Sequence, residues 1–242
     1  MRALLDRARA SLNVYYNLVE KNMGFPRHRE LEAALRVGNI VECSDLCLKV
    51  GELLDSVKGR SVCIVGPLAE PIDVKRCDIV LAPDGGLVPL IMAKVRPLVI
   101  TTDADSSSKI MSMAFQLSRY IALHVHGDNM TQVALAINSI DRDKLIPTSQ
   151  VLTPLCILPV GAFTDGDRAV ALALELGAES VRVIGFDFDR VSCLHKDLCD
   201  QRPQPKLTKL RVAKAVIDLL ASELGYAVSH DGQDLLIGRR SA

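Results

Sequence analysis

The 242-residue chain contains no tryptophan, and only 4% of its residues are aromatic. Proteins that bind single-stranded nucleic acid use aromatic side chains as stacking platforms for the bases, so this scarcity argues against that function. Neither sign of charge is in excess, because 29 lysine and arginine residues balance 29 aspartate and glutamate residues. No overall field therefore draws the chain to nucleic acid or to a membrane surface.

Long apolar runs are also absent, and none reaches the roughly 18 residues of a membrane span. The N-terminal segment, Met1 to Arg7, is charged and amphipathic, unlike a secretory signal. Apolar residues make up 49% of the chain and charged residues 24%, which is the composition of a globular protein with a full core. We therefore expect a cytoplasmic protein with no membrane and no nucleic-acid partner.

The seven cysteines form no paired C-x-x-C sets. Cys193, His195 and Cys199 have a spacing that suits metal ligands, but a fourth ligand at the usual zinc spacing is missing. We expect buried free thiols for the most part. A Cys193–Cys199 disulfide is the alternative if the source is a hyperthermophile, in which intracellular disulfides occur.

The glycine-rich fingerprints of nucleotide cofactors are missing as well. The chain has no G-x-x-x-x-G-K-[ST] motif, and Gly66-Pro67 lacks the further glycines of a dinucleotide-binding turn. Neither a P-loop nor Rossmann cofactor binding is supported.

Short apolar runs alternate with helical stretches from residue 59 onward. The runs cover 61–65, 78–82, 98–101, 120–124, 154–158 and 180–184, and the helical stretches cover 86–94, 106–118, 128–140 and 166–177. This alternation predicts an α/β fold with a mostly parallel, Rossmann-like sheet and helices on both faces. A long helix from about residue 207 and a hairpin around Asp231-Gly232 follow.

The first 58 residues carry helical periodicity only, with a break at Gly24-Phe25-Pro26. We therefore predict a helical N-terminal region over 1–58 and an α/β domain over 59–242. Tyr15 and Tyr16 lie on an amphipathic helix, which fits either a cover for the sheet or a homodimer interface.

Aspartate is the acid that this chain favours, and its positions are the most informative feature of the sequence. Aspartate outnumbers glutamate 20 to 9, and eight aspartates lie in short segments that follow the apolar runs. The carboxyl ends of parallel strands meet at one edge of a sheet, where ligands bind. Carboxylates gathered there can hold Mg²⁺ together with substrate phosphates.

Each acidic segment also has a purely structural interpretation. Asp103-Ala104-Asp105 could hold a metal or cap the next helix, and Asp165-Gly166-Asp167-Arg168 opens a helix whose dipole favours acids. Arg168 adds a group that pairs phosphate oxygens. Asp84-Gly85-Gly86 either forms a plain turn or allows the backbone to approach a ligand closely.

Two histidines and a group of lysines are the remaining candidate site residues. His124 and His126 lie on one face of a strand, which is typical of some metal-dependent hydrolases, although a satisfied histidine or a substrate donor is the more common state. Lysines near the start of the long helix either form a solvated face or neutralise a triphosphate.

Six segments carry a resemblance, in chain order: Ala82-Pro83-Asp84-Gly85, Thr102-Asp103-Ala104-Asp105, His124 to Asn129 (HVHGDN), Phe163 to Val170 (FTDGDRAV), Gly185 to Phe188 (GFDF) and Lys206 to Leu210 (KLTKL). Together they resemble the archaeal 6-hydroxymethyl-7,8-dihydropterin pyrophosphokinase family, which is related in fold to thiamin pyrophosphokinase. The match runs from about residue 60 to 215.

The resemblance implies transfer of diphosphate from ATP, the co-substrate, to the hydroxymethyl group of a reduced pterin with Mg²⁺, serving methanopterin- or folate-type coenzymes. It implies catalytic roles for Asp103, Asp105, Asp165, Asp167 and Arg168. Asp103, Asp105 and Asp165 would hold the metal. Substrate contacts would come from Asp84, Gly85, His126, Gly127, Asp128, Asn129, Thr164, Asp187, Lys206 and Lys209.

Other functions stay open at this point. A thiamin pyrophosphokinase would use the same chemistry on another acceptor. A glycan or sugar-phosphate transfer enzyme and a nucleotide-binding module of the same fold are further alternatives.

Overall fold

A computed structural model describes residues 2–21, 24, 26–190 and 203–240. The Cys193, His195 and Cys199 group lies outside these residues. Within the described chain, no helix combines the length and the apolar character needed to cross a membrane.

Nine strands of the described chain form one sheet in the order β6-β5-β4-β3-β2-β1-β7-β9-β8. They are β1 (Ser61–Val65), β2 (Val80–Pro83), β3 (Val99–Thr102), β4 (Tyr120–His124), β5 (Leu145–Ser149), β6 (Leu158–Pro159), β7 (Ser180–Ile184), β8 (Tyr226–Asp231) and β9 (Asp234–Arg239). Strands β1 to β7 pair in parallel. The predicted hairpin is β8–β9, and it joins the sheet antiparallel to β7.

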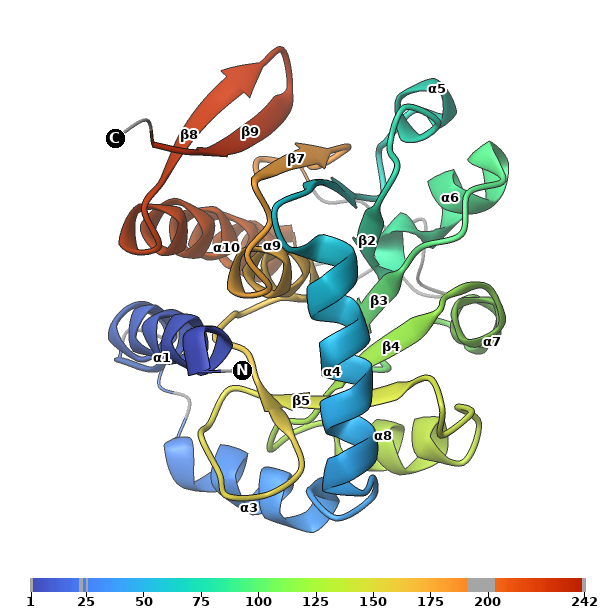
Figure 1. The fold of residues 1–242 in the computed structure, drawn as a ribbon, viewed down its shortest axis with the longest axis vertical. Coiled ribbons are helices and arrows are strands. Elements are labelled where there is room, and N and C mark those ends of the chain that lie inside the picture. The colour runs from blue at the N-terminus through green and yellow to red at the C-terminus, as the bar shows by residue number, and fades with distance from the viewer. Residues whose placement is uncertain (1, 22–23, 25, 191–202, 241–242) are drawn as a thin grey trace.

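The helices lie on both sides of this sheet, as predicted. They are α1 (Arg2–Tyr15), the π-helix η1 (Tyr16–Glu20), α3 (Arg27–Val37), α4 (Cys43–Val57), α5 (Pro71–Val74), the short 3₁₀ helix η2 (Asp84–Gly86), α6 (Leu87–Ala93), α7 (Ser108–Leu117), α8 (Met130–Ile137), α9 (Asp165–Glu175) and α10 (Pro203–Glu223). Figure 1 shows α5 to α8 along one side and α1, α9 and α10 on the other.

Helix α9 is the centre of the second side. All its residues from Gly166 to Glu175 are buried, because the helix packs on β1, β2, β3 and β7 and is covered by α1 and α10. Leu4 of α1 and Leu53 of α4 belong to the same hydrophobic core as Ile64 of β1. The N-terminal helices thus pack on the sheet, and a domain boundary at residue 58 stays a prediction.

The fifth strand lies elsewhere than predicted. Residues 145–149 form β5, whereas 154–157 form a loop and only Leu158 and Pro159 form β6. Pro147 argues against a strand, but its missing N–H is tolerated because β6 pairs only with Thr148 and Ser149. The loop is held instead at Cys156, whose N–H donates to the carbonyl of Gly38 at 3.1 Å.

The expectation of buried free thiols is wrong for all five cysteines in the described part of the chain. Cys43 is bonded to Cys156 and Cys63 to Cys77, and Cys47 is free and exposed. The first bond joins the start of α4 to the loop before β6, across 113 residues of sequence. The partners are 113 and 14 residues apart, and neither separation belongs to a paired-cysteine motif, so the sequence gave no signal of the bonds.

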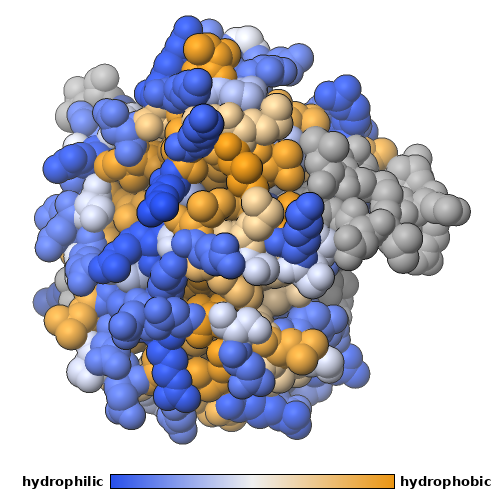
Figure 2. Space-filling model, turned by 90° about the vertical axis from the view of Figure 1, so that its right-hand side faces the viewer, coloured by the Kyte–Doolittle hydropathy of each residue, from blue (hydrophilic) through white to orange (hydrophobic). Residues whose placement is uncertain are grey.

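The side formed by α5 to α8 faces the viewer in Figure 2, where hydrophobic side chains appear among hydrophilic ones. Ile72, Met92 and Leu135, one each from α5, α6 and α8, are more than 60% exposed. Single exposed apolar residues are normal on monomers. The homodimer stays a prediction.

Glu175, at the end of α9, is a fully buried acid and makes stability depend on pH. It accepts a hydrogen bond from the Ser11 hydroxyl, and burial raises the pKa of Glu175 to about 8. The folded state therefore binds a proton that the unfolded state has released between about pH 4.5 and 8, so stability falls as pH rises through this window.

We expect Glu175→Gln to remove part of this pH dependence. Each unit of pKa difference is about 1.4 kcal/mol, and about 1 kcal/mol moves the Tm of a chain of this size by about 2–4 °C. The variant should lose several degrees less than the wild type between pH 5 and 8.5 in thermal denaturation. Glu179→Gln, at an exposed position, is the control. Parallel pH curves for the wild type and the Glu175→Gln variant would contradict the prediction.

Candidate active site

The candidate site lies at the carboxyl edge of the sheet, where the strand order reverses. β1 has β2 on one side and β7 on the other. β1 leads to α5 and β7 leads to α10, and these helices lie on opposite faces of the sheet (Figure 1). Ligands of open parallel sheets bind at such a point. A hollow of about 420 Å³ lies here, and its walls include Asp84, Gly85, Asp103, Asp105, Thr164, Asp165, Asp167, Asp187, Lys206 and Lys209.

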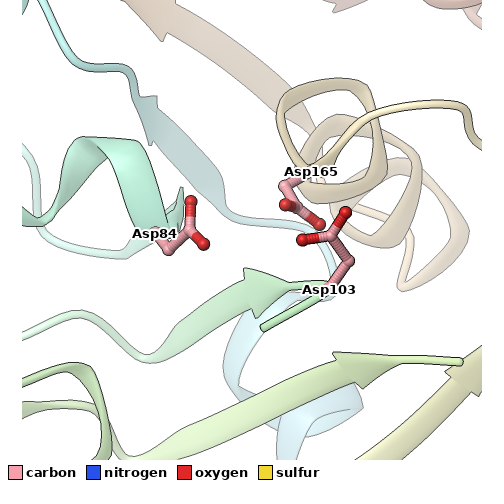
Figure 3. A group of neighbouring side chains, drawn as sticks. All are labelled: Asp84, Asp103 and Asp165. Atoms are coloured by element: carbon pink, nitrogen blue, oxygen red, sulfur yellow. The ribbon is translucent and has the colours of Figure 1, made fainter. Parts of the chain in front are cut away.

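Three carboxylates converge in this hollow, from Asp84, Asp103 and Asp165 (Figure 3). One oxygen from each lies within 4.8 Å of the other two. Asp84 begins η2 after β2, Asp103 follows β3, and Asp165 is the first residue of α9. Three oxygen ligands at this spacing suit a hard cation such as Mg²⁺.

Burial and mutual repulsion make this cluster unfavourable when it has no cation. Desolvation, followed by the charge of Asp103, raises the pKa of Asp84 to about 6. The same two causes raise the pKa of Asp165 well above its usual range, although the Arg168 guanidinium opposes the rise. Buried like charges of this kind are typical of functional sites, because a stable core would not retain them.

The loop after β3 has a fixed shape that aims Asp103 at the cluster. The N–H of Asp105 donates to Asp103 Oδ1 at 3.2 Å, and Ala104 between them has φ +63°. Asn129 holds this loop to the neighbouring one, because its amide donates to the carbonyls of Asp103 at 2.9 Å and His124 at 2.8 Å. Asn129 is thus a buried brace between two loops.

The start of α9 shows how two neighbouring aspartates take different roles. Asp167 accepts hydrogen bonds from the N–H groups of Phe163 at 2.7 Å and Thr164 at 2.6 Å, which completes a capping box with Thr164. Its carboxylate is therefore occupied by the helix cap, and its catalytic role stays a prediction. Asp165 faces the cluster and pairs with Arg168 Nη1 at 2.5 Å.

A second hollow of about 330 Å³ lies beside the first. The two share Asp103, Asp105, Phe163, Thr164 and Lys209 as walls. The second is lined further by Tyr15, Glu30, His124, His126, Asp128, Asn129, Gln132, Gln150 and Arg168. Ligands bound in the two hollows would therefore approach each other beside Asp103.

Phe186, Phe188 and Lys206 line the first hollow but not the second. Lys206 and Lys209 reach it from α10, and Phe186 and Phe188 stack with ring centroids 6.1 Å apart. Asp187, between them, pairs with Arg190 at 3.3 Å. The first hollow therefore combines an aromatic surface and lysine side chains with the carboxylate cluster.

The two histidine rings lie 5.9 Å apart, but they do not share a strand as predicted, because β4 ends at His124 and His126 follows in the loop. His124 is buried, and its ring nitrogens interact with Thr148 Oγ1 at 3.3 Å and Gln150 Oε1 at 3.2 Å. Desolvation lowers the pKa of His124 well below its usual range, so this ring is neutral. His126 is half-buried and lies 3.9 Å from Asp103 Oδ2.

Most of the predicted site residues therefore meet around the two hollows, and the details of four residues follow. Asp84, expected on the substrate, joins the carboxylate cluster, whereas Asp105 is exposed on the rim of both hollows, and its role as a metal ligand stays a prediction. Gly127 lies outside both hollows and packs against Arg29. Asp128 is exposed and pairs with Arg29 at 3.8 Å.

Sequence reasoning missed the residues that the N-terminal helices supply. Tyr15 of α1 and Glu30 of α3 line the second hollow. In the sequence they belong to ordinary amphipathic helices, and only the docking of those helices brings them to the site. Gln150 was missed because it directly follows β5, a strand that the sequence did not reveal.

Comparison with known proteins gives a consistent result, although no family model matches the chain. Three curated proteins named 6-hydroxymethyl-7,8-dihydropterin pyrophosphokinase are similar to it. The protein of Methanocaldococcus jannaschii is 24% identical over 87% of this chain and 95% of its own length. The protein of Pyrococcus furiosus is 28% identical over 85% and 91%, and that of Methanothermobacter thermautotrophicus 27% over 85% and 92%. The expected resemblance to the archaeal 6-hydroxymethyl-7,8-dihydropterin pyrophosphokinase family is therefore confirmed over most of the chain.

Proposed function

We propose that this protein transfers diphosphate from ATP to the hydroxymethyl group of 6-hydroxymethyl-7,8-dihydropterin, giving AMP and the pterin diphosphate. The observation that carries the proposal is the carboxylate cluster of the first hollow, because one of its members, Asp103, also lines the second hollow. The names of the three relatives agree with the predicted enzyme class, a diphosphokinase.

The donor set fits Mg²⁺. Asp84, Asp103 and Asp165 would hold the ion, since their oxygens converge and their mutual repulsion is relieved by a divalent cation. A bound Mg²⁺ would polarise the phosphate oxygens and neutralise the charge that develops in the transfer.

ATP fits the first hollow best. Lys206 and Lys209 can neutralise phosphate charge, and Gly85 and the start of α9 allow the backbone to approach phosphate oxygens. Phe186 and Phe188 offer a surface for the adenine ring. In this arrangement the protein mainly positions the reactants, which is the principal task of an enzyme in phosphoryl transfer.

The acceptor fits the second hollow. Tyr15, Gln132 and Gln150 line it with uncharged donors and acceptors, which suit a neutral heterocycle. An acceptor lying in this hollow would present its hydroxyl to the β-phosphorus of ATP beside Asp103. Arg168, paired with Asp165, would keep that carboxylate in place and reduce its charge.

Phosphorus NMR of ATP and Mg²⁺ with the protein tests this function. AMP and a pterin diphosphate should appear only when reduced 6-hydroxymethylpterin is added. Turnover with thiamin and none with the pterin would favour the thiamin pyrophosphokinase alternative. No turnover with either acceptor would favour a glycan-transfer enzyme or a nucleotide-binding module. A cytoplasmic role in methanopterin- or folate-type coenzyme synthesis belongs to the same proposal.

A further inference from the structure

One buried carboxylate beside the site has an oxygen that the fold leaves unused. Glu30 is 5% exposed and lines the second hollow from the first turn of α3. Its Oε1 accepts a long hydrogen bond of 3.5 Å from the N–H of Gly127, and its Oε2 makes none within the described part of the chain. A buried, unpaired carboxylate oxygen is costly, and such a cost is retained where a ligand supplies the missing donor.

A structural explanation of Glu30 covers only part of these observations. An acid in the first turn of a helix is stabilised by the helix dipole, and α3 has no side-chain cap. An acid at an exposed position of the first turn would gain the same stabilisation from the helix dipole without the cost of desolvation. Desolvation, the largest influence, instead raises the pKa of Glu30, while the His126 ring and the Gln150 amide oppose the rise.

The unpaired groups of this hollow match one type of ligand edge. Besides the acceptor of Glu30, the buried Nε–H of Arg168, another residue lining the hollow, lacks a partner among the described residues. A 2-amino-4-oxopyrimidine ring presents two N–H donors side by side and a carbonyl acceptor next to them. A carboxylate can accept from both donors at once.

We propose that Glu30 is the specificity-determining residue for the acceptor and accepts hydrogen bonds from the 2-amino and N3–H groups of a 2-amino-4-oxopyrimidine ring. The inference rests on the proposed function and deepens it, because it names the edge by which the acceptor is recognised. The aminopyrimidine of thiamin places its amino group beside a ring nitrogen that accepts, so it lacks this pair of donors. A buried site built to pair such groups strongly rejects a ligand that lacks them.

Fluorescence titration with two probes tests the proposal. The first probe is 6-hydroxymethylpterin, and the second is 6-hydroxymethyl-lumazine, in which a 2-oxo group replaces the 2-amino group. The wild type should bind the pterin at least about 10²-fold more tightly, because the lumazine carbonyl faces a carboxylate. This comparison needs no variant, and equal affinities would overturn the inference.

The variant Glu30→Gln should change this preference. Its amide can donate to the 2-oxo group, so the preference should fall at least about tenfold, with KM for ATP unchanged. Glu32→Gln, an exposed position on the same helix, is the matched control. A structural role alone would weaken both probes equally and would overturn the inference. A wild type that binds neither probe would instead overturn the proposed function, and this inference with it.

Discussion

Replacing Asp103 by asparagine should lower turnover about 10³-fold while leaving the fold intact. The loss corresponds to about 4 kcal/mol of transition-state stabilisation, which is the scale of a metal-held charge. The stability of the metal-free protein should stay the same or rise, because the charge of Asp103 raises the pKa values of both Asp84 and Asp165. Turnover assays and thermal denaturation with and without Mg²⁺ measure the two effects.

The chain contains a closely matched control for this variant. Asp141 lies in a second Asp-x-Asp turn, where the N–H of Asp143 donates to Asp141 Oδ1 at 3.2 Å, the same bond that joins Asp105 to Asp103. Asp141 is exposed and lines neither hollow. Asp141→Asn should therefore keep full turnover. Near-normal turnover of Asp103→Asn, or an equal loss in both variants, would refute the metal role.

Replacing Gly86 by alanine should destabilise the protein by about 3 kcal/mol or more. An added Cβ at Gly86 would lie 1.9 Å from the carbonyl oxygen of Val65, the last residue of β1. Val65 is fully buried and pairs with Ile184 of β7, so the strand has little room to move. The change also displaces η2, which begins with Asp84, so activity should fall at temperatures where the variant is still folded.

Gly51→Ala is the matched control for this prediction. Gly51 lies within α4, and an added Cβ there meets nothing within 4 Å. Alanine is a better helix former than glycine, so this variant should be more stable by about 0.5–1 kcal/mol. Urea denaturation of both variants gives the comparison. A Gly86→Ala variant as stable as the wild type would show that β1 and η2 can separate without cost.

The sequence pattern predicted a strand correctly where the residues of that strand alone carry the pattern. The strands 61–65, 120–124 and 180–184 were predicted with their observed bounds, because short apolar runs between turns can be buried on both faces only in a parallel sheet. β5 was missed because its formation depends on a neighbouring strand and not only on its own sequence pattern. Pro147 is unfavourable in most strands, and it is accepted here only because of the short neighbour β6, which no local pattern reveals.

The roles of the aspartates needed the tertiary structure. Asp165 and Asp167 are two residues apart at the same helix start, yet one faces the cluster and the other caps the helix. Both orientations fit the sequence equally well, since acids at a helix N-terminus are favoured for either reason. Likewise, Asp84 and not Asp105 joins Asp103 and Asp165, because distances across neighbouring strands depend on how the loops turn.

The sequence by itself determined the class of fold, the edge of the sheet that carries the acids, and the resemblance to a pyrophosphokinase family. These follow from periodicity and from motifs within single elements. Only the tertiary structure decided which oxygens converge, that two hollows meet at Asp103, and that Glu30 of a distant helix lines one of them. Such contacts join residues far apart in the chain, and they depend on how α1 and α3 pack on the sheet.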